Sequence, residues 1–517
     1  MRNYTTKCLV LFSSLFGAGV FAQAPDALLK DINPGSGSGM SYSNYDTRLN
    51  GKVYFIADKD GYQDLLWATD GTVAGTQLAV PASTVSYVGE MVANGSRVVF
   101  EGLSGSKEGL FITNAAGTGA SPLRLFDDQE IFHLYRRQQD DKVLFGTEPF
   151  AGGSSQFWVT NGTIAGTVKL GDFTVVDGYM FYSPWMDKTI MVEQSTNWDQ
   201  APPVITDGTP AGTNLLKDAL TNVANFYSID GAVGTGDLLF VSGKVEIGGF
   251  LYNKAFAVDS TSSQEFSLFG DVRRAYKSGD FYYLATTDEL LRYDKSTNTL
   301  TLLNSDYDYF SEPVLQDEKL YFTARDKQVW ESDGTVAGTK KRSTAGIGNF
   351  NYDPRIWVHG DSLFYFSDAA GKAIRLVDLN TSTDTLFATV FQSSGLVLIP
   401  RLWKFGNTFV YPKSTATNGY EIWASPMPLL TGVINPTANR EPLLLTPNPT
   451  SGMCRLPAQL QDAEAVIRIF DETGRLVATR NLDGNTLLDL STQATGIYSV
   501  VVKTKNGKVY SGSVVRK

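Results

Sequence analysis

Cysteine and histidine are nearly absent from this chain of 517 residues. It has two cysteines, Cys8 and Cys454, and two histidines, His133 and His359. The long stretch between the cysteines therefore cannot be held by disulfide bonds, and it cannot form a zinc site that uses thiolates. The two histidines are far apart in sequence, so most histidine-dependent catalysis is excluded and we expect both to be packing or surface residues.

Long apolar runs are also lacking, except at the N-terminus. There, Arg2 and Lys7 precede the segment CLVLFSSLFGAGVFA. A positive start, an apolar stretch and small residues at its end predict a secretory signal peptide over residues 1–22, cleaved between Ala22 and Gln23. A membrane anchor is the alternative, but a membrane span needs about 20 apolar residues. No later segment is apolar enough to form one, so we predict an exported chain without a transmembrane anchor.

Positive charge is scarce in the central part of the chain. The net charge is −10 overall; residues 1–22 carry +2 and residues 443–517 carry +3, so residues 23–442 carry −15. Such a body is not expected to bind nucleic acid or an anionic membrane surface. It is compatible with cations, neutral glycans or basic proteins, and the charge also favours solubility.

One short motif recurs along the body. The segments LWATDGTVAGT (66–76), FWVTNGTIAGT (157–167), VITDGTPAGT (204–213) and VWESDGTVAGT (329–339) share a polar turn. Their Asp or Asn positions are 70, 161, 207 and 333, which are spaced by about two, one and three copies of a unit of about 42–46 residues. Degenerate copies fall in the gaps and bring the count to nine units. Self-similarity at a fixed period predicts a repeat architecture.

Each unit contains a short strand, a turn, a VYF-type strand, a hairpin, an LW-type strand, the DGT turn and a closing strand. Four strands in 40–45 residues are typical of one blade of a β-propeller. The sequence therefore predicts an all-β fold, with a large β-propeller of eight or nine blades, each of four antiparallel strands, over residues 23–430.

The DGT turn has a structural explanation. The Asp70 carboxylate can accept hydrogen bonds from the backbone N–H groups that follow it, and Gly71 and Gly75 can adopt positive φ. A calcium or ligand role is the alternative. We predict the same structural role for the equivalent residues of the other copies, which are Asn161, Gly162, Gly166, Asp207, Gly208, Gly212, Asp333, Gly334 and Gly338.

Tryptophan recurs at one position of the unit, as Trp67, Trp158, Trp330 and Trp423. Such repeated aromatic residues most often fill the space between adjacent blades. An exposed platform for glycans is the alternative, and only their exposure distinguishes the two.

The motif resembles the ELWxxDGT-type repeat of large secreted bacterial proteins, most closely at DLLWATDGTVAGT and QVWESDGTVAGT. In that family each unit ends with an LVKDI-like strand and an NPGS-like turn. Here that element occurs as LLKDINPGSGSG from Leu28, at the start of the mature chain. We expect this strand to complete the last blade, near residues 420–425, and to close the ring so that no sheet edge is exposed.

A different pattern follows a linker at 431–442 that is rich in Pro, Asn and Thr. In residues 443–517, strands alternate with tight turns at Thr473-Gly474, Asp483-Gly484 and Asn506-Gly507. This pattern predicts a small Ig-like β-sandwich of about seven strands.

The same segment is similar to the type A sorting domain of type IX secretion substrates. The residues that carry the resemblance are Pro447, Asn448, Pro449, Gly452, Gly474, Gly496, Tyr498, Arg516 and Lys517. The resemblance implies that the type IX machinery recognises residues 443–517, carries the chain across the outer membrane of a Bacteroidetes-type host to the cell surface or the medium, and usually removes the domain there. An ordinary terminal Ig-like domain is the alternative.

Motifs of known chemistry are missing. There is no G-x-S-x-G, H-E-x-x-H or P-loop, so no catalytic or cofactor-binding residue is assigned. Asp58, Asp60, Gly61 and Asp64 resemble half of a calcium loop, but such residues are also common in hairpins. We predict a non-enzymatic recognition protein for a surface glycan or protein. The alternatives are a polysaccharide lyase or glycosidase and a passive surface protein.

Overall fold

Strands make up almost all of the regular structure. The computed structural model describes residues 26–41, 45–59, 63–151, 154–173, 179–194, 202–268, 270–308, 312–347, 356–367, 373–390, 401–426, 440–457, 460, 465–470, 476–482, 486–504 and 509–517. One short helix, α1 (Leu216–Ala219), accompanies the strands of these residues. The chain divides into two compact units, Gln23–Met427 and a second made of Met1–Ala22 with Pro428–Lys517. The predicted signal peptide and its cleavage site lie outside the described residues.

The described part of Gln23–Met427 contains nine four-stranded antiparallel sheets, numbered here in chain order. Sheet 1 is β2 (Asp46–Leu49), β3 (Lys52–Asp58), β4 (Asp64–Thr69) and β5 (Gln77–Leu78); sheet 2 is β6 (Tyr87–Asn94), β7 (Arg97–Ser104), β8 (Lys107–Thr113) and β9 (Ala120–Phe126); sheet 3 is β10 (Gln129–Arg136), β11 (Val143–Pro149), β12 (Ser155–Thr160) and β13 (Val168–Phe173). Sheet 4 is β14 (Tyr179–Trp185), β15 (Lys188–Gln194), β16 (Val204–Thr206) and β17 (Asn214–Leu215); sheet 5 is β18 (Phe226–Gly234), β19 (Leu239–Ile247), β20 (Phe250–Val258) and β21 (Ser263–Phe266); sheet 6 is β22 (Arg274–Ser278), β23 (Phe281–Ala285), β24 (Leu290–Asp294) and β25 (Thr299–Asn304). Sheet 7 is β26 (Val314–Gln316), β27 (Lys319–Thr323), β28 (Val329–Ser332) and β29 (Lys340–Lys341); sheet 8 is β30 (Ile356–His359), β31 (Ser362–Ser367), β32 (Ala373–Asp378) and β33 (Thr383–Thr389); sheet 9 is β34 (Trp403–Phe405), β35 (Thr408–Thr415), β36 (Gly419–Pro426) and, from the other end of the chain, β1 (Ala27–Lys30).

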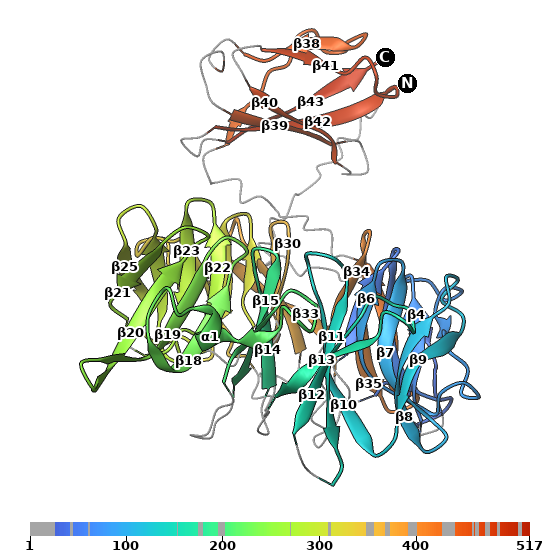
Figure 1. The fold of residues 1–517 in the computed structure, drawn as a ribbon. Helices are drawn as coiled ribbons and strands as arrows, with labels where there is room; N and C mark the ends of the chain where they lie inside the picture. Colours follow the sequence, from blue (N-terminus) through green and yellow to red (C-terminus); the bar gives the residue numbers. More distant parts are fainter. Residues whose placement is uncertain are drawn as a thin grey trace, which may run out of the picture. The chain divides into compact units, whose positions relative to one another are not determined.

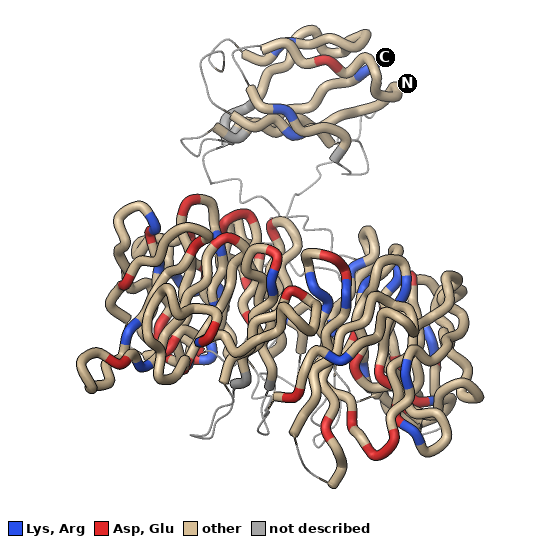
Figure 2. Tube along the Cα trace, viewed as in Figure 1, with Lys and Arg blue, Asp and Glu red and all other residues tan. Residues whose placement is uncertain are grey.

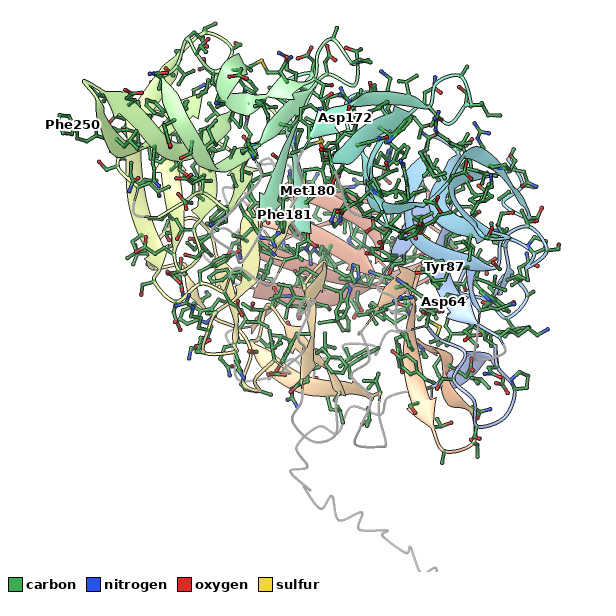
Figure 3. The ribbon with its side chains drawn as sticks, turned by 60° about the horizontal axis from the view of Figure 1, so that its bottom comes forward. Asp64, Tyr87, Asp172, Met180, Phe181 and Phe250 are labelled. Carbon is green, nitrogen blue, oxygen red and sulfur yellow. The ribbon has the colours of Figure 1, made fainter. Side chains whose placement is uncertain are left out.

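The sheets follow one another in a propeller-like ring (Figures 1 and 3). First strands of consecutive sheets lie against each other, as β2 does with β6, β6 with β10 and β10 with β14. They therefore line the inside of the ring. The last sheet meets the first, because Trp403 Nε1 donates to the Asp46 carboxylate at 3.1 Å and the Trp403 ring lies 5.1 Å from that of Phe55.

Apolar cores lie between consecutive sheets. Residues 53–57 of β3 are all buried, because each sheet is covered on both faces by its neighbours. The repeated tryptophans belong to this packing: Trp67 and Trp158 are each 5% exposed, and Trp158 lies in a cluster that joins sheets 2 and 3. Trp330 packs against the cluster between sheets 6 and 7. The expectation that these tryptophans fill the space between sheets is confirmed for Trp158 and Trp330.

The N-terminal strand completes sheet 9, as the sequence predicted. β1 pairs antiparallel with β36, with Ala27 opposite Ala424 and Leu28 opposite Trp423. Lys413 Nζ forms an ion pair of 2.6 Å with Asp26 beside this pairing. Residues almost 400 positions apart thus share one sheet.

A buried carboxylate holds the turn that follows β1. Glu421, on β36, has no exposed surface, and its two oxygens accept hydrogen bonds from the backbone N–H groups of Ile32 (2.8 Å) and Asn33 (3.1 Å). Burial raises the pKa of Glu421 to about 7, even though these N–H groups favour the charged form. We refer to β1, Ile32, Asn33 and Glu421 as the N-terminal latch.

The second unit has two sheets in its described residues. One has the order β37 (Arg440–Pro442), β43 (Val509–Arg516), β42 (Gly496–Thr504), β39 (Ala465–Phe470) and β40 (Leu476–Leu482); the other pairs β38 (Met453–Arg455) with β41 (Leu487–Asp489). Residues 440–442, which the sequence analysis places in the linker, pair in parallel with β43. A core of aliphatic side chains around the free, fully buried Cys454 holds the unit together.

Candidate functional site

The DGT turn is held by the first side chain of the motif. The Asp70 carboxylate accepts hydrogen bonds from the N–H (2.9 Å) and the hydroxyl (2.6 Å) of Thr72, which lowers the pKa of Asp70. The Thr69 and Thr76 hydroxyls bond to each other at 2.7 Å across the base of the turn. The copies at Asn161, Asp207 and Asp333 have the same bonds to the threonine two residues later.

The two glycines of the turn have different roles. Gly71 has a φ of +86°, as expected. The expectation of positive φ was wrong for Gly75: a Cβ built there would instead collide with the Asp70 carboxylate, so the site must lack a side chain. The same holds for each equivalent pair, which are Gly166 with Asn161, Gly212 with Asp207 and Gly338 with Asp333.

The first glycine also brings the turn against the preceding sheet of the ring. A Cβ at Gly71 would lie 2.8 Å from Phe405 of sheet 9, and one at Gly208 would lie 2.9 Å from Arg137 of sheet 3. Arg137 is itself 2% exposed and donates to the carbonyl oxygen of Thr206 at 3.2 Å. The motif therefore builds the interface between sheets as well as a turn.

Gly75→Ala is expected to lower the free energy of unfolding by about 1–3 kcal/mol, because the added methyl group displaces the Asp70 carboxylate from Thr72. Urea unfolding of the variant measures the loss. Gly105→Ala is the control, because it also replaces a glycine but nothing lies within 4 Å of the added methyl group. Its φ of +65° adds a backbone strain that Gly75 does not have. A Gly75 variant as stable as the native protein would contradict the collision.

The sequence did not reveal a cluster of acids and tyrosines that spans sheets 1 to 3. It lies around the inner strands β6 and β10 and includes carboxyl groups of the neighbouring strands β7 and β8. Its centre is Glu90 on β6, whose side chain is 13% exposed. One oxygen accepts from the Tyr45 hydroxyl at 2.9 Å, and the other accepts from the backbone N–H of Leu134 on β10 at 2.6 Å. Glu90 therefore joins three consecutive sheets where they face the inside of the ring. We call Tyr45, Tyr87, Glu90, Glu101, Glu108 and His133 the inner-strand cluster.

Bulges in two of the strands determine where these side chains point. The register of β6 shifts between Val88 and Met91, and Gly89 leaves room for the Glu101 carboxyl, which accepts from the Glu90 N–H at 3.2 Å. Such bulges redirect side chains and are frequent beside functional sites.

A second bulge lies in β10, between Phe132 and Tyr135. His133 within it has a φ of +55°. Its Nδ1 atom lies 3.7 Å from Glu90, and its carbonyl oxygen accepts from the Tyr182 hydroxyl at 2.9 Å. This bond connects the cluster to sheet 4.

The carboxyl groups of the cluster differ in burial and in pKa. Glu101 is 8% exposed and shares a hydrogen bond with Glu108, and burial raises the pKa of both groups. Burial and the nearby Glu101 raise the pKa of Tyr87 to about 12. At neutral pH the cluster therefore offers hydroxyl groups and carboxyl oxygens together. The Tyr45 and Tyr87 side chains are 39% and 41% exposed, so part of it is accessible.

A signal for the cluster was present in the sequence. Glu90, Glu101 and Glu108 each stand beside a glycine, as Gly89-Glu90, Glu101-Gly102 and Glu108-Gly109, within strands that otherwise carry apolar residues. Carboxylates at core positions of strands are unusual unless they are paired.

The two histidines lie in different sheets, and the calcium candidates do not form a metal site in the described residues. His359 lies in sheet 8 against Phe364 and Phe409, where burial lowers its pKa to about 4, whereas His133 belongs to sheet 3. Of the calcium candidates, Asp60 and Gly61 lie outside the described residues. Asp64 interacts with Tyr87, and Figure 3 draws the two on the same face. Among the described residues, no group of three or more His, Cys, Asp or Glu side chains is arranged to hold a metal ion.

The sorting-motif residues converge in the second unit. The Asn448 side chain donates to the Ser513 carbonyl oxygen at 2.7 Å and accepts from the Val515 N–H at 2.8 Å. Arg516 donates to the Ser491 carbonyl oxygen (2.7 Å), and the backbone N–H of Lys517 donates to the Thr450 carbonyl oxygen (2.9 Å). The Pro447–Gly452 segment is thus fixed to the last strand, while the Tyr498 hydroxyl donates to the Ala494 carbonyl oxygen at 2.7 Å. Gly474 lies outside the described residues.

A family model described as a secretion system C-terminal sorting domain matches residues 445–516. This segment is a type IX secretion sorting domain. The prediction for the tail is thereby confirmed in its main point, and the domain indicates secretion across the outer membrane. No helix in the described residues is long and apolar enough to cross a membrane.

Solved structures similar to this chain include puromycin hydrolase (14% identity, 73% of this chain, 59% of that chain, TM-score 0.37). Others are the propeller domain of the trilobed protease from Pyrococcus furiosus (11% identity, 68% and 97%, TM-score 0.36) and an oligogalacturonate lyase in complex with manganese (10% identity, 71% and 96%, TM-score 0.36). The chain spans less than two thirds of puromycin hydrolase. Likenesses at this level establish neither a ligand nor an activity. No curated protein matches the chain.

Proposed function

We propose that this chain is a non-enzymatic recognition protein, exported by type IX secretion to the cell surface or the medium of a Bacteroidetes-type host, which binds a glycan or a protein ligand. In this proposal residues 1–22 are the signal peptide, the nine sheets over residues 23–430 are the blades of an ELWxxDGT-type β-propeller, and residues 431–442 connect it to a sorting domain at 443–517. The ligand binds at the inner-strand cluster.

The observation that carries the proposal is the arrangement around Glu90. A hydroxyl donor and a backbone donor from the two neighbouring sheets fix this carboxylate, and the hydroxyl is that of the partly exposed Tyr45. The partly exposed Tyr87 interacts with Glu101, which in turn accepts from the Glu90 N–H. Fixed acceptors next to aromatic rings suit the hydroxyl groups of a neutral sugar or the cationic side chains of a basic protein. The charge of −15 on residues 23–442 favours the same ligands over anionic ones.

The alternative of a glycosidase is less well supported. Retaining enzymes hold two carboxyl groups about 5–5.5 Å apart, and inverting enzymes hold them farther apart, so that a sugar fits between them. Glu101 and Glu108 instead share a hydrogen bond, and Glu101 is almost completely buried. The pair therefore supports the strand bulge rather than a substrate.

Tyr87→Ser is expected to weaken binding of the ligand by about tenfold or more, because an aromatic contact surface is lost. A glycan array and a set of surface proteins, probed with the native chain, identify the ligand, and titration calorimetry compares the variants. Tyr227→Ser, on the inner strand β18, is the matched control, since Tyr227 is 64% exposed and belongs to sheet 5.

Two results would contradict the proposal. One is binding that is unaffected by Tyr87→Ser but lost with Tyr227→Ser. The other is turnover of any polysaccharide by the native chain in a parallel hydrolysis and lyase assay, which would establish the enzyme instead.

A further inference from the structure

One hairpin of the ring differs from its equivalents. β19 and β20 are nine residues long, and their outer parts extend beyond the rest of sheet 5 (Figure 1). The pairing of β20 with β21 begins only at Ala255, so residues 250–254 have no strand on that side within the described part of the chain. The turn is Gly248-Gly249, with φ of +62° and +83°.

The tip of this hairpin is apolar. Its exposed fractions are 52% for Ile247, 69% for Phe250, 48% for Leu251 and 47% for Tyr252. Figure 3 draws Phe250 at the outer end of the hairpin, and Figure 2 shows no charged residue there. We call residues 247–252 the hairpin tip.

Apolar residues occur on both faces of the tip. Side chains alternate between the faces of a strand, so Phe250 and Tyr252 lie on one face, together with Ile247 opposite Phe250, and Leu251 lies on the other. If a partner covered one face of the hairpin, apolar residues would be expected on that face and polar residues on the other. A tip that is apolar on both sides instead fits a medium that surrounds it.

The equivalent hairpins provide an internal comparison. In residues 104–107 of sheet 2, 286–289 of sheet 6, 325–327 of sheet 7 and 416–418 of sheet 9, polar or charged residues predominate. In the described part of the sheet 3 hairpin, Phe150 is the one large apolar residue at the tip and is 67% exposed. The repeat itself therefore does not require apolar side chains at this position.

The size and charge of the tip distinguish between partners. A stable protein interface takes about 20–30 residues from each side, whereas the tip has six, which is too few for a second copy or a folded protein. Behind it, Lys244 opposes Asn253, and Lys254 is paired with Glu265. Lysines at this depth can reach head-group phosphates while the apolar tip enters the acyl region, and a tyrosine such as Tyr252 favours the interface between them.

We propose that the hairpin tip inserts into the surface of a lipid bilayer and holds the exported protein on a membrane. Glu246, directly behind Ile247, limits the insertion to the tip. The acidic body is repelled by anionic lipids, so the preferred surface is a zwitterionic one. This attachment does not depend on the ligand of the inner-strand cluster.

Flotation of the exported protein with phosphatidylcholine vesicles tests the proposal. The double variant Phe250→Ser/Leu251→Ser is expected to lose vesicle binding by about tenfold or more. Ile164→Ser is the matched control: Ile164 is 73% exposed in the turn between β12 and β13, and its loss leaves binding unchanged. Adding phosphatidylglycerol to the vesicles weakens binding at low salt. Tyr87→Ser leaves flotation unchanged, which separates this test from that of the ligand site.

A second readout does not depend on affinity. Phe250→Trp is expected to give fluorescence that brominated phosphatidylcholine quenches, beyond the signal of the native tryptophans, whereas Ile164→Trp is not quenched. The proposal is overturned if the native protein does not float with vesicles, or if the double variant floats equally well. It is also overturned if the double variant loses only self-association or the binding of a protein or glycan.

Discussion

Glu421→Ala is expected to release the N-terminal strand and to lower the free energy of unfolding by about 2–5 kcal/mol. The buried N–H of Ile32 and the partly buried N–H of Asn33 both lose their acceptor, at a cost of about 1–3 kcal/mol each. Without the latch, β36 exposes an edge where β1 was paired. The variant should therefore also associate through sheet 9.

Thermal and urea unfolding measure the stability, and limited proteolysis followed by mass spectrometry detects release of the segment that begins near Asp26. Glu265→Ala is the matched control, because the Glu265 side chain is half exposed on the outer strand β21. It is expected to change stability by less than about 1 kcal/mol. Equal stability of the two variants would show that the latch does not close the ring.

Deletion of residues 443–517 is expected to abolish export and to leave the body in the periplasm. The deletion removes the sorting domain at 445–516 and lies within the second of the two compact units. The unit Gln23–Met427 keeps its nine sheets and its latch, so the truncated protein should accumulate folded. Cell fractionation with detection of the body measures the effect.

Met453→Ala is the control for the deletion, since Met453 is 43% exposed in the tail and is not one of the motif residues. It should be exported normally. Display of the truncated chain on the surface at the native level would refute the role of the tail.

Local chemistry explains which features could be predicted. The bonds from Thr72 to Asp70 span two residues, so the turn can be recognised wherever the motif occurs. Apolar strands between such turns predict four-stranded units in the same way. The tail was recognised because its motif residues occur in a fixed order along a short segment.

Other features depend on residues that meet only in the ring. Gly75 is a separate, local case: it was assigned to the wrong constraint, because its collision with Asp70 of the same turn appears only once that turn is folded. Glu90 receives its bonds from Tyr45 and Leu134, 45 and 44 positions away. No local pattern specifies such contacts, since they follow from the way one sheet packs on the next.

The sequence by itself determined that the chain is a repeated all-β protein with an export tail, and that β1 lacks a unit of its own. These properties depend on turn chemistry, strand propensity and the order of the motif residues, all of which act over short stretches. Only the tertiary structure decided that Glu421 binds Ile32 and Asn33, that Glu90 joins three consecutive sheets and that the hairpin tip is left uncovered. Packing between sheets fixes which distant backbone groups meet and which side chains stay exposed, and this geometry is set when the ring closes.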